Sequence, residues 1–512
     1  MKGRLRRRLT GTIAVIAAVA TLGAVALATA CATANRHLVQ ADVVIEHVAI
    51  VSPERPRPLE DVSVAIANGR IAAIGANLRV SPPARIIDGR GRYLTPGLID
   101  SHVHIGTPVG YDDVPLGERP DLLASYRAQV PRAYLAFGFT TIVDVDLKPG
   151  HRAWFEATPL HPRLLHCSRA VRTAGGYGAL RIRPETAARD YPNLVFEPGR
   201  ATNWPATLDP ADHTPERVVS RVADEGGSCV KAFVEPGFGV FDWPVPEPGT
   251  LDALRTETRR RALTFMVHAT GVQGWRAAVK ARADVIAHGL WHWPGDRRSA
   301  TPPEETGALV RDVARAGTRV QLTLRVLDND EAFFDAALLD DPRVALALPA
   351  AIVASLRTPE AEAARHAVAK SYDDMAGKMG ITGGATPLIA IAEERARATL
   401  RLMLDAGVTL IFGSDTPSGE GIGNTPGLNG RLELQEWAEA GVPLRTILHA
   451  ATLGNAEAFG LTAELGTVAV GKRADLLLLG ANPLTNITAY DALEMLFVGG
   501  QPIPRHSLRS QD

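Results

Sequence analysis

The organisation of this chain follows from one heptapeptide, Leu98-Ile99-Asp100-Ser101-His102-Val103-His104. Apolar residues lead into two histidines that are two positions apart. In a β-strand this spacing puts both imidazoles on the same face, so the two rings can bind one metal ion together. We therefore expect a strand over 98–104 that presents His102 and His104 at its carboxyl end.

Four more apolar runs end in a polar residue that can act in a metal centre. The polar residues are Lys231 after Cys229-Val230, His268 after Phe265-Met266-Val267, His288 after Val285-Ile286-Ala287, and Asp415 after the run 409–414. A parallel barrel presents its active-site residues in this way, at the carboxyl ends of its strands. The pattern predicts that all six side chains meet at one mouth of such a barrel.

Short apolar strands alternate with helical stretches through the centre of the chain, which favours βα units around a parallel sheet. The expected strands are 98–104, 140–145, 163–168, 228–233, 264–268, 284–288, 319–324 and 409–415, and the expected helices include 121–137, 250–262, 272–282, 306–316 and 391–406. Eight strands are the number that a closed (β/α)8 TIM barrel needs. We assign this α/β barrel to residues 96–463.

The stretch 325–390 is charged and rich in alanine, and it interrupts the barrel pattern after the seventh strand. Residues 360–370 within it have helical spacing. Because it follows a strand on the active-site face, it is either a lid or substrate wall, or a solvated helical insertion without function.

The two ends of the chain are rich in short strands. Asn68-Gly69 between apolar runs is a strong hairpin signal, and residues 474–479 form a buried strand pattern. The first of these units is too thin to bury its own face. We therefore expect 41–95 and 464–506 to form one discontinuous composite β-sandwich, with the barrel inserted between its halves.

Composition limits the classes of function. The chain has 512 residues, of which 22% are charged, and its formal net charge is −1. Without a basic excess, nucleic-acid binding is not expected as its main purpose. Three cysteines are too few for a disulfide framework. We expect Cys167 and Cys229 to be core thiols and not ligands.

Residues 1–30 have the pattern of an export signal, with a basic start, an apolar stretch over 13–28 and small residues before Cys31. The region resembles a bacterial lipoprotein signal, in which Cys31 would be acylated. An ordinary cleaved secretory signal and an uncleaved anchor are the other two interpretations. All three place the folded body outside the cytoplasm, in the periplasm or cell envelope.

The six expected site residues suit a pair of divalent ions, with Zn²⁺ as the first choice, because zinc prefers imidazole and carboxylate ligands. Two ions close together repel each other, so such a site needs anionic bridges. The ammonium of Lys231 would be repelled. Carboxylated by CO₂, Lys231 becomes a carbamate (N6-carboxylysine), an anion with two oxygens that can bridge two ions.

Longer motifs around these residues resemble the amidohydrolase superfamily. They are residues 94–104, Gly138-Phe139-Thr140-Thr141, Ala283-Asp284-Val285-Ile286-Ala287-His288-Gly289, Ala450-Ala451-Thr452, and the pair 466–468 and 471–475. The sequence is most similar to the binuclear branch with a carboxylated lysine, in its imidazolonepropionase-like and zinc-dependent Xaa-Pro dipeptidase (prolidase) group. This resemblance implies a distorted (β/α)8 barrel beside a composite β-sandwich.

The resemblance also implies roles for the site residues. His102 and His104 would bind the more buried ion, His268 and His288 the exposed one, and Lys231 would bridge them. Asp415 would complete the shell of the buried ion and move a proton from the metal-bridging hydroxide to the leaving nitrogen. Mononuclear deaminases of the superfamily use a different residue at the position of Lys231, so their chemistry is disfavoured.

Three further residues are candidates for substrate binding. His166 ends the third strand, Tyr177 lies in the glycine-rich loop 175–178, and His292 lies between two tryptophans. At both His166 and His292, a packed histidine without a role in catalysis is the favoured interpretation.

The sequence thus predicts an exported metal-dependent amidohydrolase, lipid-anchored at Cys31, that cleaves a C–N amide bond in a small molecule. A dipeptide or N-acyl amino acid is the first expectation for its substrate. A cyclic amide or lactam hydrolase is the alternative enzyme, and a mononuclear deaminase is a more distant one. A non-catalytic binding protein on the same fold is the alternative from another class.

Overall fold

The computed structural model describes residues 38–109, 118–327, 336–417 and 422–510. The expected export signal and Cys31 lie outside these residues, as does the part of the expected insertion at 328–335. Within the described part of the chain, no helix has both the length and the apolar character that a bilayer crossing requires.

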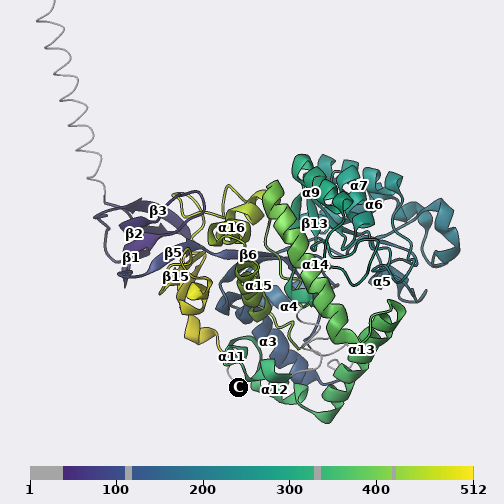
Figure 1. The fold of residues 1–512 in the computed structure, drawn as a ribbon. Helices are drawn as coiled ribbons and strands as arrows, with labels where there is room; N and C mark the ends of the chain where they lie inside the picture. The colour runs from purple at the N-terminus through teal and green to yellow at the C-terminus, as the bar shows by residue number, and fades with distance from the viewer. Residues whose placement is uncertain (1–37, 110–117, 328–335, 418–421, 511–512) are drawn as a thin grey trace, which may run out of the picture.

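The two ends of the chain meet in one eight-stranded sheet, which Figure 1 shows on one side of the molecule. Its strand order is β17-β16-β15-β5-β1-β2-β3, and β4 pairs with β1. Its strands are β1 (Val43–Ile50), β2 (Leu59–Ala67), β3 (Arg70–Gly75), β4 (Arg85–Asp88), β5 (Tyr93–Pro96), β15 (Leu476–Leu479), β16 (Leu493–Val498) and β17 (Gln501–Pro504).

The pairing of β5 with β15 joins the terminal segments of this sheet. Its apolar core combines residues such as Ile45 and Val64 with Leu476 and Phe497, and all four are fully buried. Each segment alone would leave this apolar surface in water, and burial of that surface drives their association.

Seven parallel strands and one extended segment form the barrel. The strands are β6 (Leu98–Val103), β7 (Phe139–Asp144), β8 (Arg163–His166), β11 (Cys229–Phe233), β12 (Thr264–His268), β13 (Val285–Ala287) and β14 (Arg319–Gln321). Residues 409–416 close the ring, because this segment forms parallel bridges to β14 at Val320 and to β6 at Val103. The backbone hydrogen bond from Ser228 to His166 connects the remaining edges, beside β8 and β11.

Helices follow most of these strands and cover the outside of the ring. They are α3 (Pro120–Ala136), α4 (His151–Ala157), α6 (Pro215–Asp224), α7 (Pro248–Arg260), α8 (Val272–Lys280), α9 (Glu304–Ala316), α14 (Ala385–Ala406), α15 (Leu428–Glu439) and α16 (Leu444–His449). The amphipathic pattern of α6 explains this arrangement, since Val218 and Val222 are buried against the ring while its polar face meets water. The α/β fold expected from the sequence is confirmed.

A short parallel pair, β9 (Arg172–Thr173) and β10 (Leu194–Val195), lies in the connection from β8 to β11, with α5 (Ala187–Asp190) between its strands. The described part of the insertion is helical. It contains η3 (Ala336–Asp340), α11 (Val344–Ala347), α12 (Ala350–Leu356) and α13 (Pro359–Lys378), and α13 runs beside α14 in Figure 1.

The floor of the barrel contains a disulfide that the sequence analysis missed. Cys167 and Cys229 are bonded, with an S–S distance of 2.06 Å and a Cα–Cα distance of 4.4 Å. The prediction of two separate core thiols is therefore wrong. Both side chains point into the barrel from adjacent strand positions, and neighbourhood in space cannot be read from two cysteines that are 62 positions apart.

Candidate metal centre

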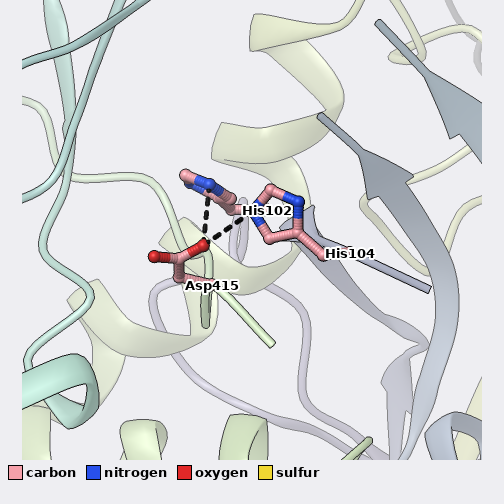
Figure 2. A group of neighbouring side chains, drawn as sticks. All are labelled: His102, His104 and Asp415. Atoms are coloured by element: carbon pink, nitrogen blue, oxygen red, sulfur yellow. Dashed lines mark hydrogen bonds and ion pairs between the residues drawn. The ribbon is translucent and has the colours of Figure 1, made fainter. Parts of the chain in front are cut away.

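Two of the expected histidines converge on one carboxylate oxygen of a third expected site residue, Asp415. Oδ1 of Asp415 lies 2.9 Å from Nε2 of His104 and 3.1 Å from Nε2 of His102, as Figure 2 shows. His102 is on β6, and His104 is the first residue after that strand. Asp415 comes from the segment that closes the ring. The backbone N–H of Asp415 donates to the carbonyl of His102, which fixes the two elements against each other.

A glutamine from β14 sets the orientation of the His102 ring. The side-chain amide of Gln321 donates to Ser101, at 3.0 Å to its carbonyl and 2.7 Å to its hydroxyl, so its oxygen faces His102. Nδ1 of His102 donates to that oxygen at 3.0 Å. Because one ring nitrogen carries the proton, Nε2 keeps its lone pair and points it into the centre.

Lys231 reaches the same point from β11. Its Nζ lies 3.2 Å from Nε2 of His102, and the residue is 1% exposed. On β11 the inward residues are Cys229 and Lys231, while Val230 and Ala232 pack outward against the helices. The two-residue period of the strand therefore places Lys231 one step above the floor of the barrel.

His268 and His288 form the other side of the centre. Their ring centroids are 4.5 Å apart, and the ring of His288 is 5.1 Å from that of His102. Nδ1 of His288 is hydrogen-bonded to the hydroxyl of Thr323 at 2.9 Å and lies 3.8 Å from Oδ2 of Asp415. The structure thus brings together all six residues that the sequence pattern singled out.

Burial determines the charges in this group. Burial, together with the charge of Lys231, lowers the pKa of His102 to about 4, and the same causes hold the pKa of His268 well below its usual range. Burial also lowers the pKa of Lys231 to about 8. Burial would raise the pKa of Asp415, but His102 and His104 outweigh it and hold that pKa well below normal. The imidazoles of His102 and His268 are therefore neutral at pH 7, and the carboxylate of Asp415 is ionised.

These residues fit a divalent metal ion. The ligand atoms of His102, His104 and Asp415 all lie within 4.8 Å of one another, and nitrogen with carboxylate oxygen is the donor set that zinc prefers. Nε2 of His268 is buried and has no hydrogen-bond partner among the described residues. A cation held between these groups would separate Nε2 of His102 from the Asp415 oxygen 3.1 Å away, and it would give the buried nitrogen of His268 a partner.

The three candidates for substrate binding have different surroundings. The ring of Tyr177 stacks on that of His268, with centroids 5.0 Å apart, so it lies beside the centre. His292 is further out, with its ring 5.7 Å from that of Phe238, and burial lowers its pKa to about 3. His166 is not brought to the centre. It lies against Arg152 of α4 at 3.4 Å, because neighbours on a strand face opposite ways and Leu165 takes the inward position.

Several supporting residues escaped the sequence analysis. Gln321 and Thr323 orient His102 and His288, and Asp100 accepts hydrogen bonds from the backbone and hydroxyl of Ser414 at 3.0 and 2.5 Å. Burial raises the pKa of Asp100 to about 7. A signal for the first two was present, because Gln321 and Thr323 are two positions apart at the end of the seventh expected strand.

Comparisons with known proteins give the family of the chain and structures with a similar fold. The model of the amidohydrolase family matches residues 93–503. The solved structure of a Xaa-Pro dipeptidase with bound methionine superposes with a TM-score of 0.61 at 20% identity, covering 90% of this chain and 99% of that one. Molinate hydrolase superposes with a TM-score of 0.62 at 19% identity, covering 92% and 96%.

Similarity to curated relatives is confined to short segments. An adenine deaminase from Deinococcus deserti is 28% identical over 131 residues, which is 25% of this chain and 23% of the relative. The matched segment is well short of the relative's full length.

The family match extends over most of the chain and includes every residue of the centre. The chain belongs to the amidohydrolase family, a family of enzymes that act on carbon–nitrogen bonds.

Proposed function

We propose that this chain is a two-metal amidohydrolase that cleaves a C–N amide bond in a small molecule, with a dipeptide or N-acyl amino acid as its substrate. The observation that carries this proposal is the meeting of Lys231, Asp415 and four imidazoles at the carboxyl end of the barrel. A single metal ion needs no lysine beside it. A bridged pair needs an anion at that position, which a carboxylated Lys231 supplies.

The residues divide into two groups around Asp415. His102 and His104 would hold the more buried ion together with Asp415, while His268 and His288 would hold the exposed one. Carboxylated Lys231 would bridge the two. Two divalent ions, with Zn²⁺ as the first choice, would polarise the amide carbonyl and lower the pKa of water at the centre.

In this proposal Asp415 is the general base. It is ionised and its Oδ1 faces both His102 and His104, so it can accept the proton of the attacking water. When the C–N bond breaks, the same carboxyl group returns that proton to the leaving nitrogen. Gln321 keeps His102 in a fixed tautomer, and Thr323 holds His288, so neither ring has to reorient during the reaction.

A screen of purified, zinc-loaded protein tests this function. The panel contains Xaa-Pro dipeptides, N-acyl amino acids, lactams and adenine, and each reaction is assayed for new primary or secondary amine and for ammonia. Amine release from a linear amide supports the proposal. Ring opening alone would favour the lactam hydrolase. Ammonia release from adenine, without amide cleavage, would favour a deaminase. Adenine is included because the Deinococcus deserti relative is an adenine deaminase.

We also propose that the protein is exported and acylated at Cys31. The disulfide in the barrel floor supports export, since such bonds persist in oxidising compartments and are rare in the cytosol. Fractionation of cells that express the full chain tests this, with labelling by a radioactive fatty acid. We expect labelled protein in the membrane fraction, and no label in Cys31→Ala. Unlabelled protein in the cytosol would contradict it.

A further inference from the structure

Five aromatic side chains form a continuous surface that begins at His268. They are Tyr177, Phe233, Phe238, Phe241 and Trp243, and we call this group the aromatic wall. Phe241 is exposed and the other four are half-buried. Aromatic residues make up only 5% of the chain, so composition alone does not account for such a group on its surface.

The wall touches the metal centre at its inner end. The rings of Phe233 and Tyr177 are 4.9 and 5.0 Å from the ring of His268. Trp243 stacks on Tyr177 at 5.6 Å, and Phe241 stacks on Trp243 at 4.8 Å. Because His268, Tyr177, Trp243 and Phe241 stack on one another in this order, a ligand whose amide carbonyl lies at the centre meets the edges of these rings on the side of His268.

The wall is held in place before any ligand binds. The carboxylate of Glu235 accepts hydrogen bonds from the backbone N–H groups of Gly237 and Phe238 at 2.9 and 2.8 Å. It also accepts one from the hydroxyl of Thr270 at 2.5 Å. These bonds fix the turn that carries Phe238, whose φ is +55°. A surface that is already ordered loses little conformational entropy on binding.

The charged groups beside the aromatic wall are of both signs. Arg172 lies over the ring of Phe233 at 5.0 Å, and Lys378 at the end of α13 lies over Phe241 at 5.1 Å. Asp242, between the two outer rings, is exposed to solvent. Arg172 is paired with Asp146 at 2.6 Å, and Lys378 and Asp242 have opposite charges, so neither sign of charge dominates and the apolar rings favour an aromatic or bulky apolar group on the ligand.

We propose that the aromatic wall selects amides that carry an aromatic or bulky apolar substituent next to the scissile bond, with Trp243 as the main determinant. This inference rests on the proposed function and names the class of its substrate. A partly exposed apolar surface beside a catalytic centre is where such a group would be removed from water.

Two matched pairs of compounds test the wall. N-acetyl-L-phenylalanine against N-acetyl-L-alanine puts the ring in the amine part, and phenylacetylglycine against acetylglycine puts it in the acyl part. For at least one pair we expect kcat/KM to favour the aromatic member by about 10- to 100-fold. Trp243→Ala should reduce this ratio about tenfold, mainly through KM.

Two further variants separate selection from folding. Trp243→Phe keeps a ring at this position and should restore most of the preference. Val470→Ala removes an exposed apolar side chain from the terminal sheet region, far along the chain from the wall, and should leave the ratio unchanged. Melting temperatures are measured for all variants.

Calorimetric titration with the same four compounds distinguishes failure of the wall from failure of the proposed function. Tighter binding of an aromatic member, lost in Trp243→Ala, supports the wall even where no compound is hydrolysed. Hydrolysis without any aromatic preference would leave the amidohydrolase function intact and overturn the wall. Absence of both binding and hydrolysis for all four compounds would also overturn it.

Discussion

Cys229 and Lys231 are two residues apart on β11, yet their surroundings are opposite in character. Cys229 belongs to the apolar floor of the barrel, where it is bonded to Cys167 among Val143, Leu165 and Met266. Lys231 reaches the mouth, where imidazoles and a carboxylate replace apolar side chains. On β11, therefore, one inward residue contributes to stability and the next inward residue, two positions further on, contributes to chemistry. Changes at the floor should affect folding, and changes at the mouth should affect turnover.

The largest expected effect is at the mouth. Asp415→Asn should reduce kcat by about 10³-fold, because the amide can neither accept nor return the proton. The backbone should tolerate it, since Asp415 has a φ of +55° and Asn adopts this region readily. Steady-state kinetics on a substrate from the screen measure kcat, and a melting curve shows whether the variant is folded. Glu494→Gln, at an exposed ion pair, is the matched control. A kcat within tenfold of wild type would contradict the proposed base.

The floor should show the reverse behaviour. Removal of the disulfide in Cys167→Ala/Cys229→Ala should lower the free energy of unfolding by about 4 kcal/mol, because the bond closes a long loop in the unfolded chain. This change in the free energy of unfolding is measured by denaturant unfolding of the variant and of the wild type, with and without a phosphine reductant. An unchanged midpoint on reduction of the wild type would show that the bond does not stabilise the barrel.

A residue that supports the mouth should have an intermediate effect. Gln321→Leu removes the acceptor that fixes the tautomer of His102. We expect the affinity for zinc to fall about 10- to 100-fold, as is usual when a group that orients a metal ligand is lost. Competition with a chelator of known affinity measures this. Unaltered zinc affinity would mean that Gln321 does not orient His102.

The smallest expected effect concerns acid stability in the loop after β7. Burial opposes ionisation of Asp146, but Arg172 and Arg169 outweigh it and lower its pKa to about 2. The folded pKa is below the unfolded value of 3.8, so this stabilisation is complete above about pH 4 and disappears as the pH falls through 2. It amounts to about 2 kcal/mol.

Unfolding experiments between pH 2 and pH 5 measure this contribution. Asp146→Asn should remove the part of the pH dependence that Asp146 supplies. A variant with the same slope as the wild type would exclude the ion pair as its source.

The sequence was sufficient to predict the strands in which apolar and polar residues follow a clear period. The heptapeptide at 98–104 and the polar residues that end four other apolar runs predicted six residues that the structure brings together. A two-residue period shows which face a side chain takes, so Lys231 and His268 could be placed. The same period explains His166, which lies against Arg152 because Leu165 takes the inward position on β8, in line with the favoured interpretation of a packed histidine.

Contacts between distant segments were harder to predict. The Cys167–Cys229 bond depends on which strands are neighbours, and the Gln321–His102 hydrogen bond depends on the closure of the ring. The aromatic wall combines the loop around Tyr177 with residues 233–243, and neither segment alone suggests it. These features come from the three-dimensional arrangement and leave only weak traces in local sequence patterns.

The most direct test of the bridging lysine is to measure the zinc content of the wild type and of Lys231→Met, after dialysis in the presence of bicarbonate. Methionine fills a similar volume but cannot form a carbamate. We predict two zinc ions per wild-type chain, and at most one in Lys231→Met, with loss of amide hydrolysis. Two ions and full activity in Lys231→Met would contradict a centre built on a bridging lysine.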